Sequence, residues 1–410
     1  MRSLKLLSFF AFVLLLATGC DTQTSEPDIP APRALTDAEL AVLQADNVFG
    51  LRLFNALASA EHEENVFISP LSVSMALGMT LNGAAGTTQS EMRTVLAKEG
   101  LTKDEINTAY RDLSTLLTSM DNAVTMQLAN SIWYREGFGV DDAFLETNKT
   151  YFNAEVSGLD FADPAAPSII NQWVDNHTNG RIQQIVERIP PEAVMYLINA
   201  TYFKGTWTYQ FNADATEDRP FYNEGGTGFS TVPTMNLSGT LPYYQTNLYG
   251  ALDIPYGNGL FSMTLLLPHP DASLDDMLAS FDEESWNALT TGLAEREADL
   301  FLPRFTLEYK KTLKETLIDL GMDDAFSAGI ADFSGISTAQ ALFLSEVTHK
   351  TFLEVNEEGT EAAAVTSVEV GTTSIDPNAP VRFEVNRPFA LALRERHTGA
   401  IMFIGRINQL

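Results

Sequence analysis

The sequence predicts an α+β fold for one large domain between residues 37 and 410. Helical patterns dominate up to about residue 188, whereas strand-like runs dominate from residue 194 onward. Separation of this kind is typical of α+β proteins and differs from a regular βαβ alternation. Neither an internal repeat nor a Pro/Gly-rich linker interrupts residues 37–410, so a single domain is the simpler interpretation.

The N-terminal half is predicted to be mainly helical. Apolar residues recur every three or four positions between residues 37 and 60, which predicts an amphipathic helix. Helical segments follow over residues 70–98, with a break at Asn82-Gly83, and over residues 104–121. Residues 124–134 predict a strand. A further helix is predicted over residues 168–188, ended by Pro190-Pro191.

The C-terminal half is predicted to be mainly strands. The strand-like runs cover residues 194–203, 241–256, 260–267, 299–307, 343–356 and 381–407. Two helical pieces interrupt them, at residues 273–294 and 310–320.

The composition excludes several classes of function. The chain has 54 acidic and 25 basic residues, a net charge of −29, which opposes binding to nucleic acid. Its single cysteine, Cys20, excludes an internal disulfide and a cysteine-based metal site in the domain. The sequence contains no GxSxG, P-loop, GxGxxG or HExxH motif. We therefore expect neither an enzyme nor a protein that binds a metal or cofactor.

The N-terminus has the layout of an export signal. A short basic start is followed by an apolar run over residues 6–16, too short to span a bilayer as a helix. The segment ATGC then resembles a bacterial lipobox. We expect residues 1–19 to be a lipoprotein-type signal peptide, Cys20 to be lipidated, and the polar, Pro-rich residues 20–36 to form a flexible tether. The alternative is an ordinary signal peptide with an incidental cysteine.

The protein is accordingly expected to be exported. It would be lipid-anchored at the cell envelope, or extracellular or periplasmic, with contact to the membrane only through the N-terminal lipid.

Residues 357–375 form an unusual segment, EEGTEAAAVTSVEVGTTSI, without proline or large side chains. Read as a strand, its even-numbered residues from Thr360 to Val370 form a small, uncharged face, while Glu361 and Glu369 lie on the other face. That pattern suits a strand with one buried face. Gly359 provides a flexible start, and prolines at 377 and 380 end the run. An ordinary small-residue strand or a polar surface loop is the alternative from these residues alone.

This segment and four others resemble the serpin family. The string EEGTEAAA, within residues 344–367, resembles the hinge of inhibitory serpins. The other segments follow in the order of the family: VFISPLSVSMALGMTLNGAAGTTQSEM (66–92), LINATYFKGTW (197–207), LPRFTLEYKKTLKETLIDLGM (302–322) and VRFEVNRPFALALRERHTGAIMFIGRI (381–407). The resemblance implies a serpin fold, with three β-sheets, eight or nine helices and an exposed reactive loop at about residues 357–380.

The resemblance also implies a function, namely suicide-substrate inhibition of serine proteases. The partner would be a target serine protease, with a cysteine protease as a second option, and the protein would be a monomer. The protease would cut the loop, form an acyl-enzyme and be trapped when the loop inserts into the central sheet. The hinge residues that match the inhibitory pattern are Glu357, Gly359, Thr360, Ala362, Ala363 and Ala364.

Family spacing places the reactive bond at Thr373–Ser374. A longer stretch than usual before Phe389 leaves Thr372, Ser374 and Ile375 as alternatives for the residue before the cut. These residues are small or β-branched, which favours an elastase-like or subtilisin-like protease over a trypsin-like one. Further residues match the family's positions that control sheet opening. The resemblance implies that the polar residues Ser69, Ser72, Asn199 and His349 hydrogen-bond across the gap in the central sheet, and that Trp207 lies near the top of the sheet, where insertion begins.

Two other classes of function remain open from the sequence. The first is a non-inhibitory serpin that acts as a binding or carrier protein, which the small hinge residues disfavour. The second is an exported hydrolase or solute-binding lipoprotein, disfavoured by the missing catalytic motifs and by the five matching segments.

Overall fold

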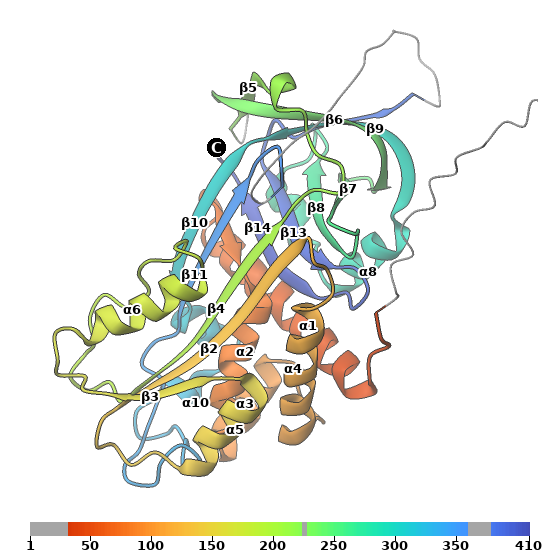
Figure 1. The fold of residues 1–410 in the computed structure, drawn as a ribbon. Coiled ribbons are helices and arrows are strands. Elements are labelled where there is room, and N and C mark those ends of the chain that lie inside the picture. Colours follow the sequence, from red (N-terminus) through yellow and green to blue (C-terminus); the bar gives the residue numbers. More distant parts are fainter. Residues whose placement is uncertain (1–31, 224–227, 360–378) are drawn as a thin grey trace, which may run out of the picture. The chain divides into compact units, whose positions relative to one another are not determined.

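The computed structural model describes residues 32–223, 228–359 and 379–410. In these residues it contains ten α-helices and three β-sheets (Figure 1), which confirms the predicted α+β fold. The helices exceed the expected eight or nine because short segments count separately, α10 having only four residues. Arg33–Leu410 form one compact unit, to which all helices and strands belong.

The helices agree with the predictions where capping signals mark their ends. Helix α1 covers the predicted range, because the Thr36 side chain and Glu39 form a capping box at its start. Helix α6 ends at His177 instead of residue 188, because Asn179 and Gly180 adopt left-handed conformations (φ 49° and 79°). The helices are α1 (Asp37–Ala60), α2 (Pro70–Leu81), α3 (Gly86–Val95), α4 (Lys103–Leu117), α5 (Asp142–Phe152), α6 (Ala166–His177), α7 (Leu274–Ala279), α8 (Glu283–Gly292), α9 (Lys314–Asp319) and α10 (Asp323–Phe326).

The largest sheet has nine strands. Its order is β1 (Val66–Ile68), β14 (Ile401–Ile407), β13 (Phe389–Glu395), β8 (Phe261–Pro268), β7 (Tyr249–Tyr256), β6 (Phe229–Gln245), β9 (Ala294–Pro303) and β12 (Val381–Glu384), with β5 (Glu217–Tyr222) paired to β6. Three predicted strands are divided in the structure. Short connections separate β6 from β7 and β12 from β13 and β14, and the range 299–307 is divided at Arg304 into β9 and β10 (Phe305–Thr312).

The other two sheets are smaller. One has the order β3 (Glu155–Leu159), β2 (Val124–Arg135), β4 (Met195–Gly205), with β2 parallel to β3 and antiparallel to β4. The other pairs β10 with β11 (Thr348–Val355) in antiparallel register, so that Lys311 lies opposite His349. Because β10 extends to Thr312, the helix predicted over residues 310–320 is reduced to α9.

A layer of helices supports these sheets from behind. Helix α2 contacts both β4 and β14. Helices α1, α2 and α4 are joined by a buried polar group, in which Lys98 Nζ lies 2.5 Å from Asp46 Oδ1 and 3.0 Å from Ser74 Oγ, and the Tyr110 hydroxyl lies 2.9 Å from Asp46 Oδ1. A buried ion pair needs such additional hydrogen bonds to offset its desolvation, and this group links α1, α2 and α4 to one another. None of the helices in the described ranges is both long and apolar enough to cross a membrane.

Candidate functional site at the gap between β4 and β11

The predicted site residues fall into two groups. Cys20, Thr360, Ala362, Ala363, Ala364, Thr373 and Ser374 lie outside the described residues. The structure places Glu357 and Gly359, together with Ser69, Ser72, Asn199, Trp207 and His349. All seven of these residues lie along β4 and β11 or in the segments that support them.

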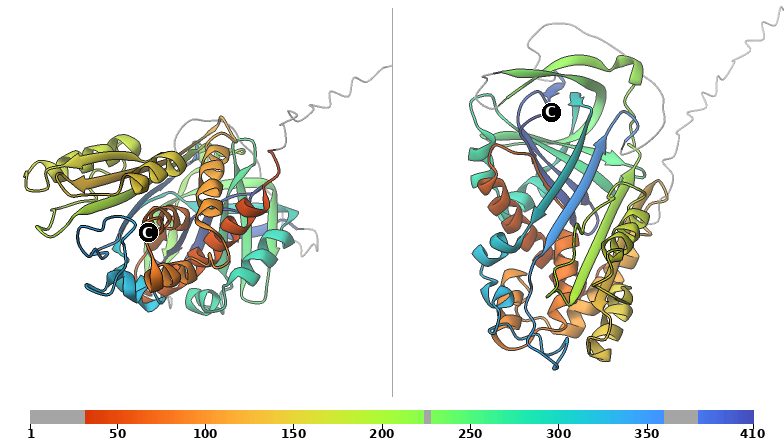
Figure 2. Two further views of the ribbon diagram at one scale, coloured as in Figure 1. Left: turned by 90° about the horizontal axis from the view of Figure 1, so that it is seen from below. Right: turned by 90° about the vertical axis from the view of Figure 1, so that its left-hand side faces the viewer.

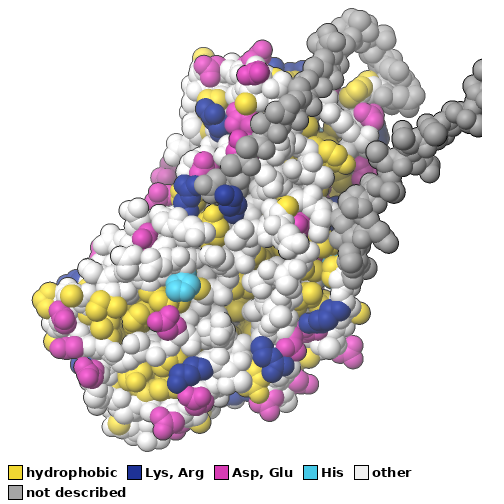
Figure 3. Space-filling model, viewed as in Figure 1, with side chains coloured by type: hydrophobic (Ala, Val, Ile, Leu, Met, Phe, Trp, Pro, Cys, Tyr) yellow, Lys and Arg dark blue, Asp and Glu magenta, His cyan; other side chains and the backbone are white. Residues whose placement is uncertain are grey.

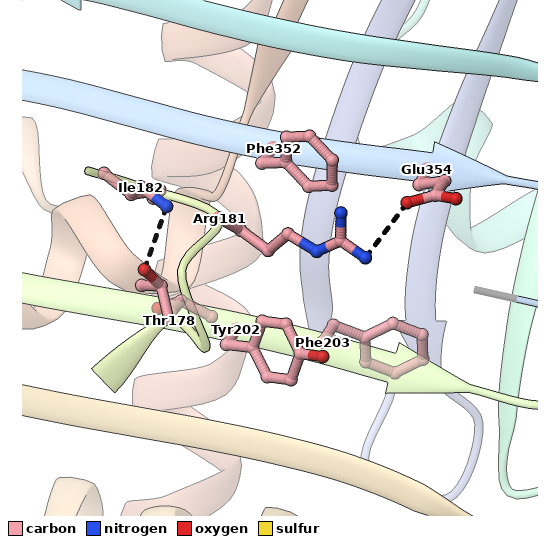
Figure 4. Close-up of a pocket in the computed structure, with 8 residues that line it drawn as sticks. Thr178, Arg181, Ile182, Tyr202, Phe203, Phe352 and Glu354 are labelled. Atoms are coloured by element: carbon pink, nitrogen blue, oxygen red, sulfur yellow. Dashed lines mark hydrogen bonds and ion pairs between the residues drawn. The ribbon is translucent and has the colours of Figure 1, made fainter. Parts of the chain in front are cut away.

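Strands β4 and β11 run alongside each other without forming a ladder (Figures 1 and 2). In the described part of the chain, β4 pairs only with β2, and β11 pairs only with β10. A small hollow of about 20 Å³ lies between the two strands, lined by Thr201, Tyr202 and Phe203 from β4, Phe352 and Glu354 from β11, and Thr178, Arg181 and Ile182 from the segment after α6 (Figure 4). We call this separation the gap.

The gap closes at one end, where the chain leaves β11. Asn356 and Gly359 exchange backbone hydrogen bonds of 3.1 and 3.3 Å, so the chain reverses there. Gly359 also forms an antiparallel bridge to Thr206, just beyond β4. Its φ of 137° favours glycine, and a Cβ atom there would lie 2.2 Å from the Gly205 carbonyl oxygen. Gly359 is therefore required by backbone conformation and by close packing.

Trp207 stabilises this closed end of the gap through ring stacking and two hydrogen bonds. Its ring is buried and stacks on Tyr256, with ring centroids 4.2 Å apart. Its indole N–H donates to the Asn356 carbonyl at 2.9 Å, and its backbone N–H donates to the Glu358 carbonyl at 3.1 Å. Trp207 thus joins the end of β4 to the turn after β11.

Glu357 is held at the same end. The Thr216 hydroxyl donates to its carboxylate at 2.7 Å, and Arg304 lies 3.6 Å from the same oxygen. The Glu357 carbonyl accepts the Phe211 N–H at 3.0 Å. Neither Thr216 nor Arg304 was singled out from the sequence; the signal for Arg304 was a lone arginine between two apolar strands.

The Ser69 backbone N–H donates to His349 Nε2 at 3.0 Å, while the Ser69 hydroxyl caps α2 by accepting the Ser72 N–H at 3.3 Å. Burial lowers the pKa of His349 to about 4, because the charged imidazolium would lose its hydration. His349 is therefore neutral at pH 7, with Nε2 as an acceptor, which places the proton on Nδ1.

Asn199 belongs to a separate group on the β4 side. Its amide donates to Asn130 Oδ1 at 2.7 Å, and its own Oδ1 accepts from the Thr201 hydroxyl at 2.8 Å. Asn130 in turn donates to the Phe152 carbonyl. The predicted hydrogen bonding across the sheet between Asn199 and His349 is absent, because the gap separates their strands. Asn130, which is buried, was not singled out from the sequence. The available signal was a polar amide residue inside the strand-like run 124–134.

The described residues contain no cluster of His, Cys, Asp and Glu that could hold a metal ion. On the face shown in Figure 3, basic side chains lie in small groups separated by acidic and neutral ones. The distinctive feature of the candidate site is therefore the gap between β4 and β11.

Comparisons with known proteins agree with this geometry. Residues 44–410 match the family model described as Serpin (serine protease inhibitor). Human neuroserpin is 34% identical over 373 residues, covering 87% of this chain and 89% of neuroserpin. The thermophilic serpin tengpin, in its native state, matches with a TM-score of 0.82 and 32% identity over 93% of this chain and 96% of tengpin. Human thyroxine-binding globulin complexed with its ligand matches with a TM-score of 0.81 and 26% identity, over 91% of this chain and all of that chain.

The lowered pKa of His349 predicts a pH-dependent stability. Between about pH 6.5 and pH 4 the unfolded chain binds a proton at His349 that the folded chain excludes, so stability falls as the pH is lowered through this window. The loss amounts to roughly 3 kcal/mol by pH 4. His349→Gln keeps an acceptor for the Ser69 N–H but does not titrate there. We expect thermal unfolding to show a smaller loss between pH 7 and pH 4.5 in this variant than in wild type.

The matched control is His62→Gln, which removes an exposed histidine. This variant should follow the wild-type pH dependence, since His62 is hydrated in both states. If thermal unfolding of His349→Gln and of wild type depends equally on pH, the loss of stability at low pH does not come from His349.

Proposed function

The chain belongs to the serpin family, and from this membership we propose that it inhibits serine endopeptidases as a suicide substrate. Serpins include protease inhibitors and also non-inhibitory binding proteins. The protease would attack the loop that follows Gly359 and form an acyl-enzyme at the cut bond. The released loop would then enter the gap as a new strand and carry the protease along. Insertion of about 15 residues at ~3.3 Å each moves the attached protease by roughly 50 Å.

The observation that carries this proposal is the gap itself. Two strands lie alongside each other without a ladder, and the chain that leaves one of them is already turned back at the end of the gap. A strand added there can form ladders with β4 and β11 at once, which provides the driving force for insertion.

The two bridges at Gly359 define the register of such a strand. Because Gly359 lies opposite both Thr206 and Asn356, each following residue would advance one place along β4 and β11. Thr366 would then lie opposite Asn199 and His349, at the centre of the gap. Its hydroxyl can donate and accept, so it suits a position between an amide and a neutral imidazole.

The same register assigns the two faces of the incoming strand. Ala362 would lie between Phe203 and Leu353, both of which face the buried helical layer. Glu361 would lie between Lys204 and Glu354 on the opposite face. The uncharged face of the loop therefore meets the core, and the acidic face meets the side that carries α6. This agreement between the loop pattern and the register supports insertion.

Target specificity follows from the residues around the proposed cut. We propose Thr373–Ser374 as the reactive bond, and a protease of elastase-like or subtilisin-like specificity as the target. No basic or aromatic side chain lies between Glu357 and Asp376, so a trypsin-like specificity pocket would have no partner. A cysteine protease that accepts small residues remains within the same proposal, since it also forms an acyl-enzyme.

A non-inhibitory binding role is the second candidate. Thyroxine-binding globulin is a serpin-like structure with a small-molecule ligand, and it matches this chain with a TM-score of 0.81. The small hinge residues Thr360, Ala362, Ala363 and Ala364 favour inhibition, because a strand of small residues enters a packed sheet with little steric cost.

We also propose that the protein is exported and lipid-anchored through Cys20, and acts as a monomer. The basic start, the short apolar run and the single cysteine directly after a small-residue segment support this proposal. A single anchored chain would present its reactive loop outside the cytoplasm, where exported or foreign proteases are encountered.

Thr360→Arg tests insertion directly. In the proposed register residue 360 lies between Gly205 and Val355, which is fully buried, so an arginine would bring a charge into the core. The variant should be cut at the wild-type rate but should release active protease, with the partition toward trapping lowered more than about a hundredfold. The measurement is formation of an SDS-stable complex, together with the heat resistance of the cut protein.

The matched variant is Thr360→Ser, which keeps a small hydroxyl side chain and should still inhibit. Wild-type protein should become much more heat-resistant after the cut, whereas cut Thr360→Arg should not. An SDS-stable complex formed by Thr360→Arg at the wild-type yield would rule out the insertion mechanism.

Mass spectrometry of the fragment released by elastase-like and subtilisin-like proteases should give a new N-terminus at Ser374. A start one or two residues away still fits the longer stretch before Phe389. Trapping of a trypsin-like protease, or a cut outside residues 372–376, would contradict the proposed specificity.

Labelling of cells with radioactive palmitate tests the anchor. The wild-type protein should carry the label, and Cys20→Ser should carry none, because the thiol is the only acceptor of this kind in the chain. A mature wild-type protein without label would instead indicate an ordinary signal peptide.

A further inference from the structure

Helix α6 is seated on one side of the gap only. Its apolar residues form a small core with β2 and β4, separate from the main core. Within this core Trp173 contacts the edge of Trp133 from β2, with ring centroids 6.4 Å apart, and Ile198 and Ala200 contribute from β4. We therefore expect α6 to move with the sheet that contains β4.

The segment after α6 places the side chain of Arg181 across the gap. The Thr178 hydroxyl donates to the Val174 carbonyl at 2.9 Å and accepts the Ile182 N–H at 3.0 Å. Asn179 and Gly180 have left-handed conformations, which reverse the chain. Arg181 follows at once, and its backbone N–H donates to the Thr178 carbonyl at 3.0 Å. The backbone of Arg181 is thus fixed to the β4 side.

The side chain of Arg181 reaches the other side. Its guanidinium lies 5.0 Å from the ring centroid of Phe352 and 3.1 Å from the Glu354 carboxylate (Figure 4). Both partners belong to β11 and lie two residues apart, on the same face. The side chains of Arg181 and Glu354 are 31% and 30% exposed, so the ion pair is partly shielded from water. In Figure 4 the guanidinium lies between the two strands.

We propose that Arg181 acts as a clasp that keeps β4 and β11 close together. Breaking its contacts with Phe352 and Glu354 would then limit the rate at which a strand enters the gap. This inference rests on the proposed function, since it assumes that the gap receives the loop. A strand seated between β4 and β11 keeps them two strand spacings apart, about 9.6 Å. Because α6 stays with β4, β11 has to move away from Arg181 during this widening.

A second ion pair also crosses between the two sheets but does not line the gap. Glu187, in the same connection, lies 2.5 Å from Lys310 on β10, with side chains 69% and 40% exposed. Such an exposed pair is screened by water and adds little. The Arg181 contact combines an ion pair with a cation–π interaction and is the stronger restraint.

The test measures opening without any protease. Uncut protein is incubated with a synthetic peptide of residues 360–373, TEAAAVTSVEVGTT, and incorporation is followed by native gel and by the heat-resistant fraction. We expect Arg181→Met, which keeps the stem over Phe352, to incorporate the peptide roughly threefold to tenfold faster than wild type. Glu354→Gln should act in the same direction.

The matched control is Arg188→Met, an equal change of charge at an exposed arginine in the same connection. It should incorporate the peptide at the wild-type rate. An Arg181→Met rate equal to that of Arg188→Met, or slower than wild type, would overturn the clasp.

The two proposals fail in different ways. If cut wild-type protein gains no heat resistance and takes up no peptide, insertion itself is wrong, and the clasp is wrong with it. If wild type gains heat resistance and takes up the peptide, while Arg181→Met does so no faster, only the clasp is wrong.

Discussion

The missing ladder between β4 and β11 is the constraint on which the rest of the structure depends. A strand edge that lies inside a protein has backbone groups that need partners, so an unfilled position between two strands is a source of free energy. The protein retains this gap while supporting it with a layer of helices and closing one end with Trp207 and Gly359. In the proposed function, the site is an incomplete sheet that is completed by backbone pairing with an entering strand.

The polar side chains along the gap form their hydrogen bonds on each side separately. His349 is bonded to Ser69 on one side, and Asn199 is bonded to Asn130 and Thr201 on the other. Each group is satisfied within its own half, so neither requires the other strand to close the gap. A buried polar cluster that was left half-satisfied would instead favour closure. The division into two groups thus allows the gap to persist without a large penalty.

The sequence predicted most of the fold but only part of this arrangement. Local signals located α1, whose capping box at Thr36 is readable from the residues. The end of α6 was missed, because the turn at Asn179 outweighs the helical pattern that continues to residue 188. Contacts between distant segments were also beyond reach. The backbone N–H of Ser69 and the ring of His349 meet only through tertiary packing, and Arg181 looks like any surface arginine until its partner on β11 is known.

In the proposed mechanism, a second anchor after the loop explains why a cut is needed. Strand β12 pairs in parallel with β9, and Arg382 and Arg219 both stack on Phe301, so the chain is held again from Val381 onward. Only 19 residues, 360–378, join Gly359 to this second anchor and its short lead-in. Each residue that enters the gap carries the chain about 3.3 Å deeper, and an uncut loop has to return over the same distance. About half of the loop is therefore the limit while β12 stays paired. That length reaches Thr366 and the centre of the gap, but complete insertion requires either a broken peptide bond or the loss of β12 from the sheet.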